Sequence, residues 1–422
     1  MKVAKGYKQT ELGVIPEEWH FKTFGEVMKG FSSGQTPSRS VKKYYTGKIP
    51  WITSGELNYN VITDTIEKIT DEAATKTHLK TIPVGTFLMA ITGLEAEGTR
   101  GSCAITGVEA TTNQSCMALY PNEKELTTDY LFQFYKKYGN QLAFKYCQGT
   151  KQQSYTGKIA KTLPIIIPTT IEEQNAITNA LNETDSLIAD LEKLIAKKQN
   201  IKQATMQVLL TGKKRLKGFK GEWEKISLRQ IGDTYGGLSG KTKKDFENGK
   251  FAFITFMNVM KNPVIDTTIF EMVNLSAGEN QNKVQKGDLL LNGSSETPEE
   301  VGMCSVLLKD YPDLYLNSFC FGFRLKKELK NDALFLSYYF RSKQGRKLFY
   351  SLAQGATRYN LSKSNFLQLE ISLPEPEEQK ELASVFLDID NEIEALQQQL
   401  AKYKLMKEGM MQDLLTGKVR LI

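Results

Sequence analysis

Two long segments of the chain place apolar residues at the seven-residue spacing of helices that pack along one another. The rows in residues 169–216 are Leu181, Ile188 and Ile195, and beside them Leu187, Leu194, Ile201 and Val208. The rows in residues 374–422 are Phe386, Ile393 and Leu400, and beside them Ile389, Leu396, Tyr403 and Met410. The pattern predicts two long helices, and each needs an apolar partner. The obvious partner of each helix is the other one.

Signals for the start and the end of a helix flank both segments. Thr169 or Thr170 can cap the first helix, and Glu172 and Glu377 place carboxylates near the positive end of the helix dipole. Gly212 and Gly417 each follow Leu-Leu-Thr, where a glycine is a typical helix stop. We therefore expect a helix of about 37 residues in each segment, about 55 Å long at ~1.5 Å per residue.

The rest of the chain is rich in Thr, Ile, Tyr, Phe and Val and is punctuated by glycine. Alternating runs at residues 85–92 and 319–325 predict strands. Residues 128–146 and 331–352 carry apolar side chains at helical spacing. These parts of the chain are therefore expected to be mixed α and β domains.

The chain is a tandem repeat. The run MQVLLTGKKRL, which ends at Leu216, returns 205 residues later as MQDLLTGKVRL, and QGTKQQSYTGK from Gln148 returns as QGATRYNLSKS from Gln354. A period of half the chain indicates two copies of a whole domain with its helix. The predicted division is a first domain over 1–168, a central helix over 169–216, a second domain over 217–373 and a C-terminal helix over 374–422.

Composition narrows the class of protein. The chain has 422 residues, 40% hydrophobic and 24% charged, which is ordinary for soluble globular proteins. The apolar runs are far shorter than the ~20 residues of a membrane-spanning helix, so we expect a cytoplasmic protein. Five cysteines and two histidines without a CxxC pair give no support for a zinc site.

Charge is unevenly distributed along the predicted segments. The two domains carry +5 each, whereas the helical segments carry +1 and −4 in chain order. This excess of basic residues favours phosphate contacts by the domains and protein contacts by the helices. An ordinary solvated surface explains a surplus of this size equally well.

Two similar domains on two similar helices form a symmetric arrangement if the helices pair antiparallel, with a pseudo-two-fold axis between the domains. Duplex DNA has matching symmetry, and two-fold arrangements commonly read two half-sites at a fixed separation. Because the two domains differ in sequence, the half-sites are expected to differ as well. The predicted target is therefore split and asymmetric.

At this point the motifs show a family resemblance. A variable domain, a P-x-EEQ helix ending in LLTGK-x-RL, and a second copy of both resemble the specificity subunit of type I restriction-modification enzymes, over essentially the whole chain. The first helix begins with IPTTIEEQ and lacks the second proline of PEPEEQ, a departure that concerns only the local turn.

The resemblance implies an α+β protein with two target-recognition domains and an antiparallel coiled coil of pseudo-two-fold symmetry. It implies a non-catalytic DNA-specificity subunit whose helices set the gap between half-sites and dock two modification (methyltransferase) subunits. The other implied partners are double-stranded DNA and restriction (translocase-nuclease) subunits. S-adenosylmethionine, ATP and magnesium are expected in the partner subunits, with no cofactor in this chain and no membrane association.

The sequence contains no complete catalytic motif. Gly240-Lys241-Thr242 ends like a phosphate-binding loop, but Tyr235 stands where that loop needs its first glycine. Glu378-Gln379-Lys380 matches the E-x-K end of many nucleases, yet its repeat counterpart, which begins at Glu173, has no lysine. Acidic residues at a helix start are favoured by the helix dipole alone. We expect no enzymatic activity from the chain itself.

The candidate DNA contacts are polar loop residues. Asn and Gln suit adenine, Arg suits guanine, and Lys, Ser and Thr suit phosphate. The candidates of the first domain are Ser33, Gln35, Thr36, Arg39, Arg100, Lys151, Gln152, Gln153 and Tyr155. Those of the second are Lys241, Lys243, Lys244, Arg358, Tyr359, Asn360 and Lys363. For each of them a surface turn without a ligand is the competing interpretation.

A second class of function stays open at this stage. A repeat-built scaffold or adaptor, whose coiled coil joins proteins and whose basic domains bind no specific DNA, has the same organisation. Sequence-selective, salt-dependent binding to duplex DNA distinguishes the two. The bases of each half-site and the length of the gap do not follow from the sequence.

Overall fold

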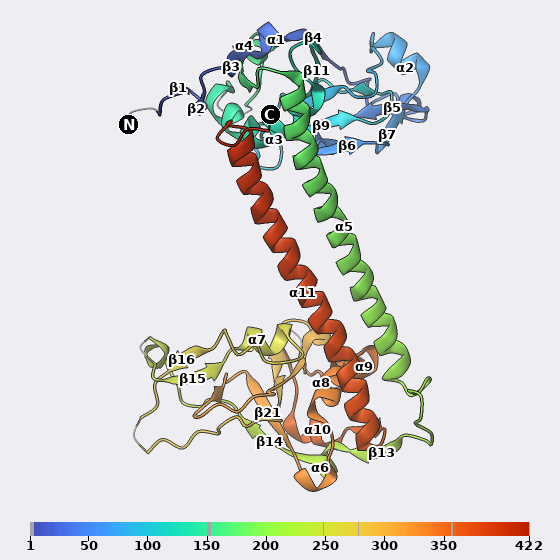
Figure 1. The fold of residues 1–422 in the computed structure, drawn as a ribbon. Coiled ribbons are helices and arrows are strands. Elements are labelled where there is room, and N and C mark those ends of the chain that lie inside the picture. Colours follow the sequence, from blue (N-terminus) through green and yellow to red (C-terminus); the bar gives the residue numbers. More distant parts are fainter. Residues whose placement is uncertain (1–3, 150–152, 248, 277, 356–357, 422) are drawn as a thin grey trace. The chain divides into compact units, whose positions relative to one another are not determined.

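The computed structural model describes residues 4–149, 153–247, 249–276, 278–355 and 358–421 (Figure 1). The chain divides into two compact units, the first formed by 1–191 with 399–422 and the second by 192–398. Each unit thus contains one globular domain, one part of the first long helix and one part of the second. The division at residues 168, 216 and 373 stays a prediction.

The first unit is built on two small sheets. Its larger sheet has the order β4-β11-β8-β9-β6 and its smaller one the order β10-β5-β7. In that order, the strands of the larger sheet are Met28–Ser33, Cys116–Pro121, Phe87–Ala90, Cys103–Thr106 and Asn60–Ile62. Those of the smaller sheet, again in the order given, are Thr111–Thr112, Ile49–Ile52 and Glu67–Ile69. Two further pairs are β1 (Tyr7–Thr10) with β2 (Gly13–Pro16), and β3 (His20–Thr23) with β12 (Pro164–Ile167). The helices of the domain are α1 (Phe24–Val27), α2 (Asp71–Lys76), α3 (Thr128–Tyr146) and α4 (Gly157–Thr162), with 3₁₀ turns η1 (Lys42–Tyr45) and η2 (Ser54–Glu56).

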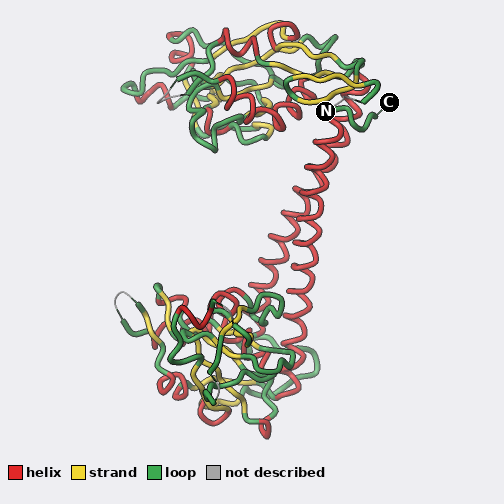
Figure 2. The backbone as a smooth tube through the Cα atoms, turned by 90° about the vertical axis from the view of Figure 1, so that its left-hand side faces the viewer, coloured by secondary structure: helices red, strands yellow, loops and turns green. Residues whose placement is uncertain are grey.

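The second unit repeats this plan. Its larger sheet has the order β14-β21-β17-β19, and its smaller sheet the order β16-β15-β20. In that order, the strands of the larger sheet are Gly232–Gly236, Cys320–Leu325, Leu289–Asn292 and Cys304–Val306. Those of the smaller sheet are Glu271–Val273, Phe251–Ile254 and Tyr315–Leu316. The pairs are β13 (Glu224–Ser227) with β23 (Glu370–Leu373), and β18 (Ser294–Ser295) with β22 (Tyr359–Asn360). The helices are α6 (Leu228–Ile231), α7 (Phe256–Lys261), α8 (Ala333–Arg341), α9 (Lys343–Leu352) and α10 (Lys363–Gln368), with 3₁₀ turns η3 (Lys243–Phe246), η4 (Pro298–Glu300) and η5 (Lys327–Leu329). Figure 2 shows short strands and helices joined by many loops in both domains, which confirms their mixed α and β character.

The two long helices lie where the heptad pattern predicts them. They are α5 (Ile171–Leu209) and α11 (Pro376–Leu414), each of 39 residues. Of the two N-cap candidates, Thr170 caps α5, because its side chain accepts a hydrogen bond from the Glu173 amide (3.2 Å), whereas the Thr169 hydroxyl donates to the Glu18 carbonyl (2.9 Å). Gly212 and Gly417 both have φ +68°, the left-handed geometry of a glycine helix stop.

Only one of the two predicted rows on α5 is buried. Leu181 and Ile195 are buried and Ile188 is half-buried, whereas Leu187, Leu194, Ile201 and Val208 are 37–43% exposed. A helix that packs against one neighbour covers a narrow stripe, so the adjoining row stays in solvent. We call the three of these residues that belong to the second unit, Leu194, Ile201 and Val208, the exposed stripe.

Within each unit the two long helices contact each other through charged side chains. In the first unit Lys407 forms an ion pair with Asp185, and the hydroxyl of Thr184 donates to the sulfur of Met410 (3.5 Å). In the second unit Lys198 pairs with Glu392 (2.6 Å) and Lys202 with Asp390 (2.5 Å). Residue numbers fall along α11 as they rise along α5, which is the direction of antiparallel neighbours.

The repeated LLTGK-x-RL run has a structural role in both units. Arg215 follows α5 and donates through Nε and Nη2 to the carboxylate of Glu378, whose side chain is 1% exposed at the start of α11. Arg420 follows α11 and donates in the same way to the buried carboxylate of Glu173, at the start of α5. Each arginine therefore holds the end of one long helix to the beginning of the other.

The glutamine of the repeated EEQ motif also has the same role twice. The side-chain oxygen of Gln174 accepts from the Thr127 amide (2.9 Å), just before α3. The side-chain oxygen of Gln379 accepts from the Asp332 amide (2.9 Å), just before α8. The motif thus joins the start of each long helix to the domain helix beside it. This structural role explains why the EEQ sequence occurs in both copies.

Two smaller predictions have different outcomes. Residues 128–146 form the single helix α3, but the helical pattern at 331–352 is divided into α8 and α9 at Ser342. The Ser342 side chain accepts from the Gly345 amide (3.3 Å) and so caps the start of α9. All five cysteines are free, and the four buried ones lie in strands.

Candidate nucleic-acid interface

Four loops of the first domain meet at one end of its sheets. The segment after β4 joins the small sheet through Gln35, whose amide donates to the Thr112 carbonyl (3.1 Å). The hydroxyl of Thr36 donates to the side chain of Gln114, in the turn before β11. Thr92, after β8, bridges to Ser154. We call residues 34–40, 91–100, 113–115, 148–149 and 153–155 the first loop cluster.

The second domain builds the same cluster with other side chains. The Leu238 amide donates to the Leu316 carbonyl (2.8 Å), as Gln35 does to Thr112, and the Leu361 amide donates to the Gly293 carbonyl (2.9 Å). Gln354 and Asn360 form an antiparallel bridge, as Gln148 and Ser154 do in the first domain. We call residues 237–242, 293–300, 317–319, 354–355 and 358–361 the second loop cluster.

Glycine is required at the equivalent position where each cluster begins. A Cβ on Gly34 would lie 1.7 Å from the Thr112 carbonyl oxygen, and one on Gly237 would lie 2.1 Å from the Asn317 carbonyl oxygen. The backbones approach too closely for any other residue. The loops after β4 and β14 are therefore fixed to the turns before β11 and β21.

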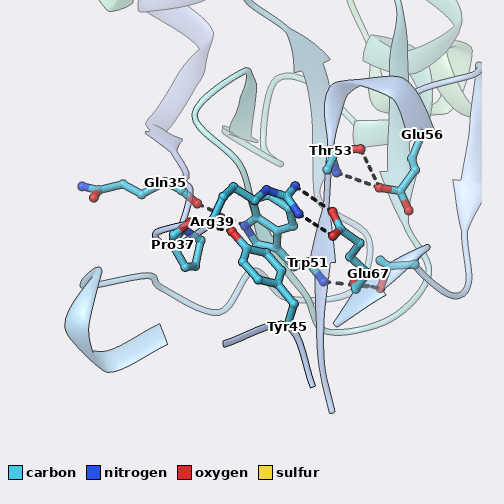
Figure 3. A network of polar contacts seen from close by, with 9 residues as sticks. Gln35, Pro37, Arg39, Tyr45, Trp51, Thr53, Glu56 and Glu67 are labelled. Atoms are coloured by element: carbon cyan, nitrogen blue, oxygen red, sulfur yellow. Dashed lines mark hydrogen bonds and ion pairs between the residues drawn. The ribbon is translucent and has the colours of Figure 1, made fainter. Parts of the chain in front are cut away.

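Arg39 sits in a polar network shown in Figure 3. Its guanidinium donates to both carboxylate oxygens of Glu67 (2.5 and 2.8 Å) and lies 4.3 Å from the centre of the Tyr45 ring. The Trp51 indole donates to the Gln35 carbonyl (3.1 Å). The hydrogen bond from Arg39 lowers the pKa of Glu67. Arg39 therefore ties the loop to the small sheet, and a contact with DNA has to be made by the outer edge of its guanidinium or after release from Glu67.

Arg100 and Tyr155 lie within the first loop cluster but are committed to protein contacts. Arg100 donates from Nε to the Leu94 carbonyl (2.8 Å) and from Nη2 to the Glu95 carbonyl (2.9 Å). Tyr155 is 3% exposed and packs in the hydrophobic core, and burial raises the pKa of its hydroxyl. Tyr155 therefore presents no aromatic surface to solvent.

The remaining first-domain candidates lie on the surface or outside the described residues. Ser33 and Gln35 are exposed, and Thr36 is half-buried beside Gln114. The Gln153 amide donates to Glu95 (2.9 Å) and its carbonyl accepts from Leu94 (3.1 Å). Lys151 and Gln152 lie outside the described residues.

The second loop cluster brings three of its candidates together. Arg358 donates from Nη2 to the Ser294 hydroxyl (3.2 Å), and the Asn360 side chain donates to the Arg358 carbonyl (3.3 Å). Tyr359 pairs with Ser295 in the small ladder of β18 and β22. Arg358, Asn360 and Lys363 are all exposed, which leaves their donors accessible to a ligand.

The three candidate lysines of η3 and the loop before it differ in their surroundings. Lys241 forms an ion pair with Glu279 (2.5 Å), and its side chain is only 7% exposed. Hydrogen bonds from Lys241, then Gln281 and the Ser276 amide, lower the pKa of Glu279 to about 2. Lys243 and Lys244 are exposed and sit on η3. They are better placed than Lys241 to meet a phosphate, because the charge of Lys241 is neutralised within the loop.

Sequence reasoning missed the turns before β11 and β21. Asn113 accepts from the Ser115 amide (3.0 Å), and Asn317 accepts from the Phe319 amide (2.9 Å), so both turns are held by an asparagine side chain. The repeat itself carried the signal, because Asn-Gln-Ser-Cys at 113 aligns with Asn-Ser-Phe-Cys at 317. The second turn presents an exposed phenylalanine where the first has a half-buried serine.

The described residues contain neither a cluster suited to a metal ion nor a helix suited to a membrane. In the described part of the chain, no group of three His, Cys, Asp or Glu side chains is placed to hold a metal ion. No described helix combines the length and the apolar character needed to cross a membrane.

Comparison with known proteins gives a consistent result. The family model of the type I restriction modification DNA specificity domain matches residues 16–203 and again residues 220–403. The MjaVIII specificity subunit of Methanocaldococcus jannaschii, a type I restriction enzyme subunit, is 25% identical over 421 residues, 96% of this chain and 94% of that protein. The MjaIX specificity subunit of the same organism is 27% identical over 289 residues, and the match spans 63% of its length.

Solved structures share the fold across nearly the whole chain. The S subunit of a type I restriction-modification system from M. genitalium has a TM-score of 0.59 at 14% identity, with 98% of both chains covered. A chain from a study of complex assembly in a type I restriction-modification system has a TM-score of 0.58 at 16% identity, covering 96% of this chain and 99% of that one.

Proposed function

This chain belongs to the family of the type I restriction-modification DNA specificity domain, and on that premise we propose that each of its two domains reads one half of a split, asymmetric DNA target. The chain acts as the sequence-specificity subunit of a larger complex. Methylation and cleavage, with S-adenosylmethionine, ATP and magnesium, belong to modification and restriction subunits in the cytoplasm. The chain itself catalyses none of these steps.

One observation carries this proposal. The two loop clusters have the same backbone hydrogen bonds but different side chains at equivalent positions, such as Ser115 and Phe319. Two domains with the same scaffold and different surface side chains can dock on DNA through the same face of the fold and read two different base sequences. A scaffold protein without DNA specificity has no need of such paired divergence.

The long helices serve as the spacer between the two readers. The ion pairs of Asp185 with Lys407 and of Asp390 with Lys202 support an antiparallel coiled coil of α5 and α11. Such a pair has the pseudo-two-fold symmetry that two half-sites on a duplex require. The gap between half-sites then depends on the length of the helices.

The exposed stripe is the docking surface that we assign to a modification subunit. Replacing Ile201 with glutamate places a charge in the stripe and should weaken binding of that subunit about 10- to 100-fold, the loss expected when burial of an isoleucine is forfeited. Calorimetric titration of the chain with the modification subunit measures this. Gln203→Glu adds the same charge on another face of α5 and should change the affinity little; equal losses in both variants would argue against docking on the stripe.

Phosphate contacts by η3 give the test of DNA binding. If Lys243 and Lys244 contact phosphate, the double variant K243A/K244A should bind all duplexes more weakly and lower the slope of log affinity against log salt by about 0.9 per lost contact. Sequence preference should be unchanged. The measurement is a salt titration of the assembled complex on cognate and unrelated duplexes.

The control for this titration is Lys225→Ala. Lys225 is an exposed lysine of the same domain that pairs with Glu370 on β13 and β23, a strand pair separate from the sheet of β14, β21, β17 and β19. Its replacement should leave the slope unchanged. Binding that lacks both salt dependence and preference for one duplex would favour the scaffold function instead.

A further inference from the structure

Phe319 is an exposed aromatic residue on a tightly held turn. Its ring is 51% exposed, although its amide donates to the Asn317 side chain (2.9 Å) and its carbonyl accepts from the Gly293 amide (2.8 Å). The amide is therefore anchored to the residue that follows β20, and the carbonyl to the residue that follows β17. A large apolar ring held rigidly in solvent costs solvation free energy and gains little packing.

The first domain shows that the fold does not require this ring. Ser115 occupies the equivalent position, where its amide donates to Asn113 (3.0 Å) and its carbonyl accepts from the Ile91 amide (2.9 Å). The same turn therefore forms with a small polar side chain. The turn therefore leaves the phenylalanine side chain free to make a contact outside the fold.

Arg358 lies against this ring. Its guanidinium carbon is 4.8 Å from the centre of the Phe319 ring, and its Nη2 donates to the hydroxyl of the buried Ser294 (3.2 Å). In the described part of the chain this is the one hydrogen bond found for its side chain, out of the five donors of a guanidinium. The stacking and this bond restrict the guanidinium plane while most of its donors remain accessible.

We propose that Phe319 and Arg358 form one base-reading pair in the second domain. Arg358 donates to O6 and N7 of a guanine, and Phe319 contacts the 5-methyl group of the neighbouring thymine. The inference rests on the proposed function and names the chemistry that the second loop cluster recognises. The 4.8 Å between guanidinium and ring lies between one and two base steps of ~3.4 Å, so two side chains this close can reach neighbouring bases on one strand.

Duplex DNA in the major groove is the occupant that this pair fits. Guanine offers two acceptors to a fork of donors, and the thymine methyl is the apolar group that this groove exposes. An arginine with a free edge and an aromatic ring with a free face match those two groups together. A protein partner would have to cover both with a carboxylate and an apolar side chain, and loss of DNA discrimination distinguishes the two occupants.

Removal of single methyl groups from the DNA tests the pair. Each thymine of the second-domain half-site is replaced in turn by deoxyuridine, and binding by the assembled complex is measured. The wild-type complex should lose affinity about fourfold at one thymine beside a guanine, the effect expected for one buried methyl. The complex with Phe319→Ser should bind the thymine and deoxyuridine duplexes equally.

The serine variant is chosen because the first domain already builds this turn with serine. Equal thermal midpoints for wild type and Phe319→Ser show that a change in binding is not a change in folding. Phe144→Ser is the matched control, since Phe144 is 77% exposed and also lies beside an arginine, Arg100, but in the first domain. This control should retain the methyl effect in the second half-site.

Three outcomes decide the inference. A methyl effect that disappears only in Phe319→Ser supports it. A wild-type complex that tolerates deoxyuridine at every position of the second half-site, or a Phe319→Ser complex that keeps the effect, overturns it. A wild-type complex with no preference among duplexes overturns the proposed function itself and is recognised before any variant is compared.

Discussion

Replacing Arg215 with alanine is expected to lower the free energy of unfolding of the second unit by about 3 to 5 kcal/mol, the usual cost of leaving a buried charge without its partner. Arg215 donates from two nitrogens to Glu378, whose carboxylate is almost fully buried at the start of α11. The hydrogen bond to Glu378 raises the pKa of Arg215, so the guanidinium keeps its charge in the folded state. Denaturant unfolding followed by tryptophan fluorescence, with Trp223 as a local probe, measures the change.

Two further variants show whether the buried charge is the cause. The double variant R215A/E378Q should be more stable than R215A alone, because it leaves no buried carboxylate unpaired. Lys225→Ala breaks an exposed pair with Glu370 and should change the stability by less than about 1 kcal/mol. If R215A proved as stable as K225A, the arginine would not hold the two helix ends together.

A paired insertion of seven residues into the long helices is expected to move the preferred gap between half-sites by about three base pairs. Seven residues add ~10 Å at ~1.5 Å per residue, and the rise between bases is ~3.4 Å. The insertions follow Ile195 in α5 and Leu396 in α11, close to the Lys198–Glu392 pair, and keep the heptad rows in phase. Binding to duplexes in which only the gap varies measures the effect.

The bases read on each side should be unchanged by the paired insertion, and binding to the original gap should fall close to the level of unrelated DNA. An insertion in α5 alone is the control. It places the heptad rows of α5 and α11 out of alignment and should weaken binding at every gap. A preferred gap that stays the same after the paired insertion would contradict the role of the helices as a spacer.

The helices could be predicted from sequence almost to the residue, because their signals are local. The heptad rows, the Thr170 cap and the glycine stops at Gly212 and Gly417 act within a few residues of the helix that they define. The division of residues 331–352 at Ser342 was not predicted, since a serine inside an apolar pattern is compatible with one helix or with a cap between two.

Exposure of individual helix rows depends on the neighbouring elements and could not be predicted from the pattern alone. Ile195 and Ile201 have the same character and the same spacing in their rows, yet one is buried and the other is exposed. The pattern identifies apolar rows but does not say how many partners a helix has. The exposed stripe on α5 is the surface on which we propose that a modification subunit docks.

The equivalence of the loops in the two domains could be predicted from the repeat, whereas the surroundings of individual side chains could not. The repeat correctly aligned the loop at Gln148 with the loop at Gln354, since both form the same bridge. Residue type alone did not distinguish Arg100, whose donors hold backbone carbonyls, from Arg358, which is exposed. Long-range partners such as Glu67 for Arg39 come from the fold and are invisible in the local sequence. The assignment of individual DNA contacts stays a prediction.

The central claim is that two domains of one chain read two parts of one DNA target. The most direct measurement is to sequence the methylated positions in the genome of a host that carries this chain with its modification subunit. The account predicts methylation at one asymmetric sequence in two parts, separated by a fixed number of unspecified bases, and a change in only one part when the second globular domain is exchanged. Methylation at a continuous sequence, or a pattern that does not depend on this chain, would contradict it.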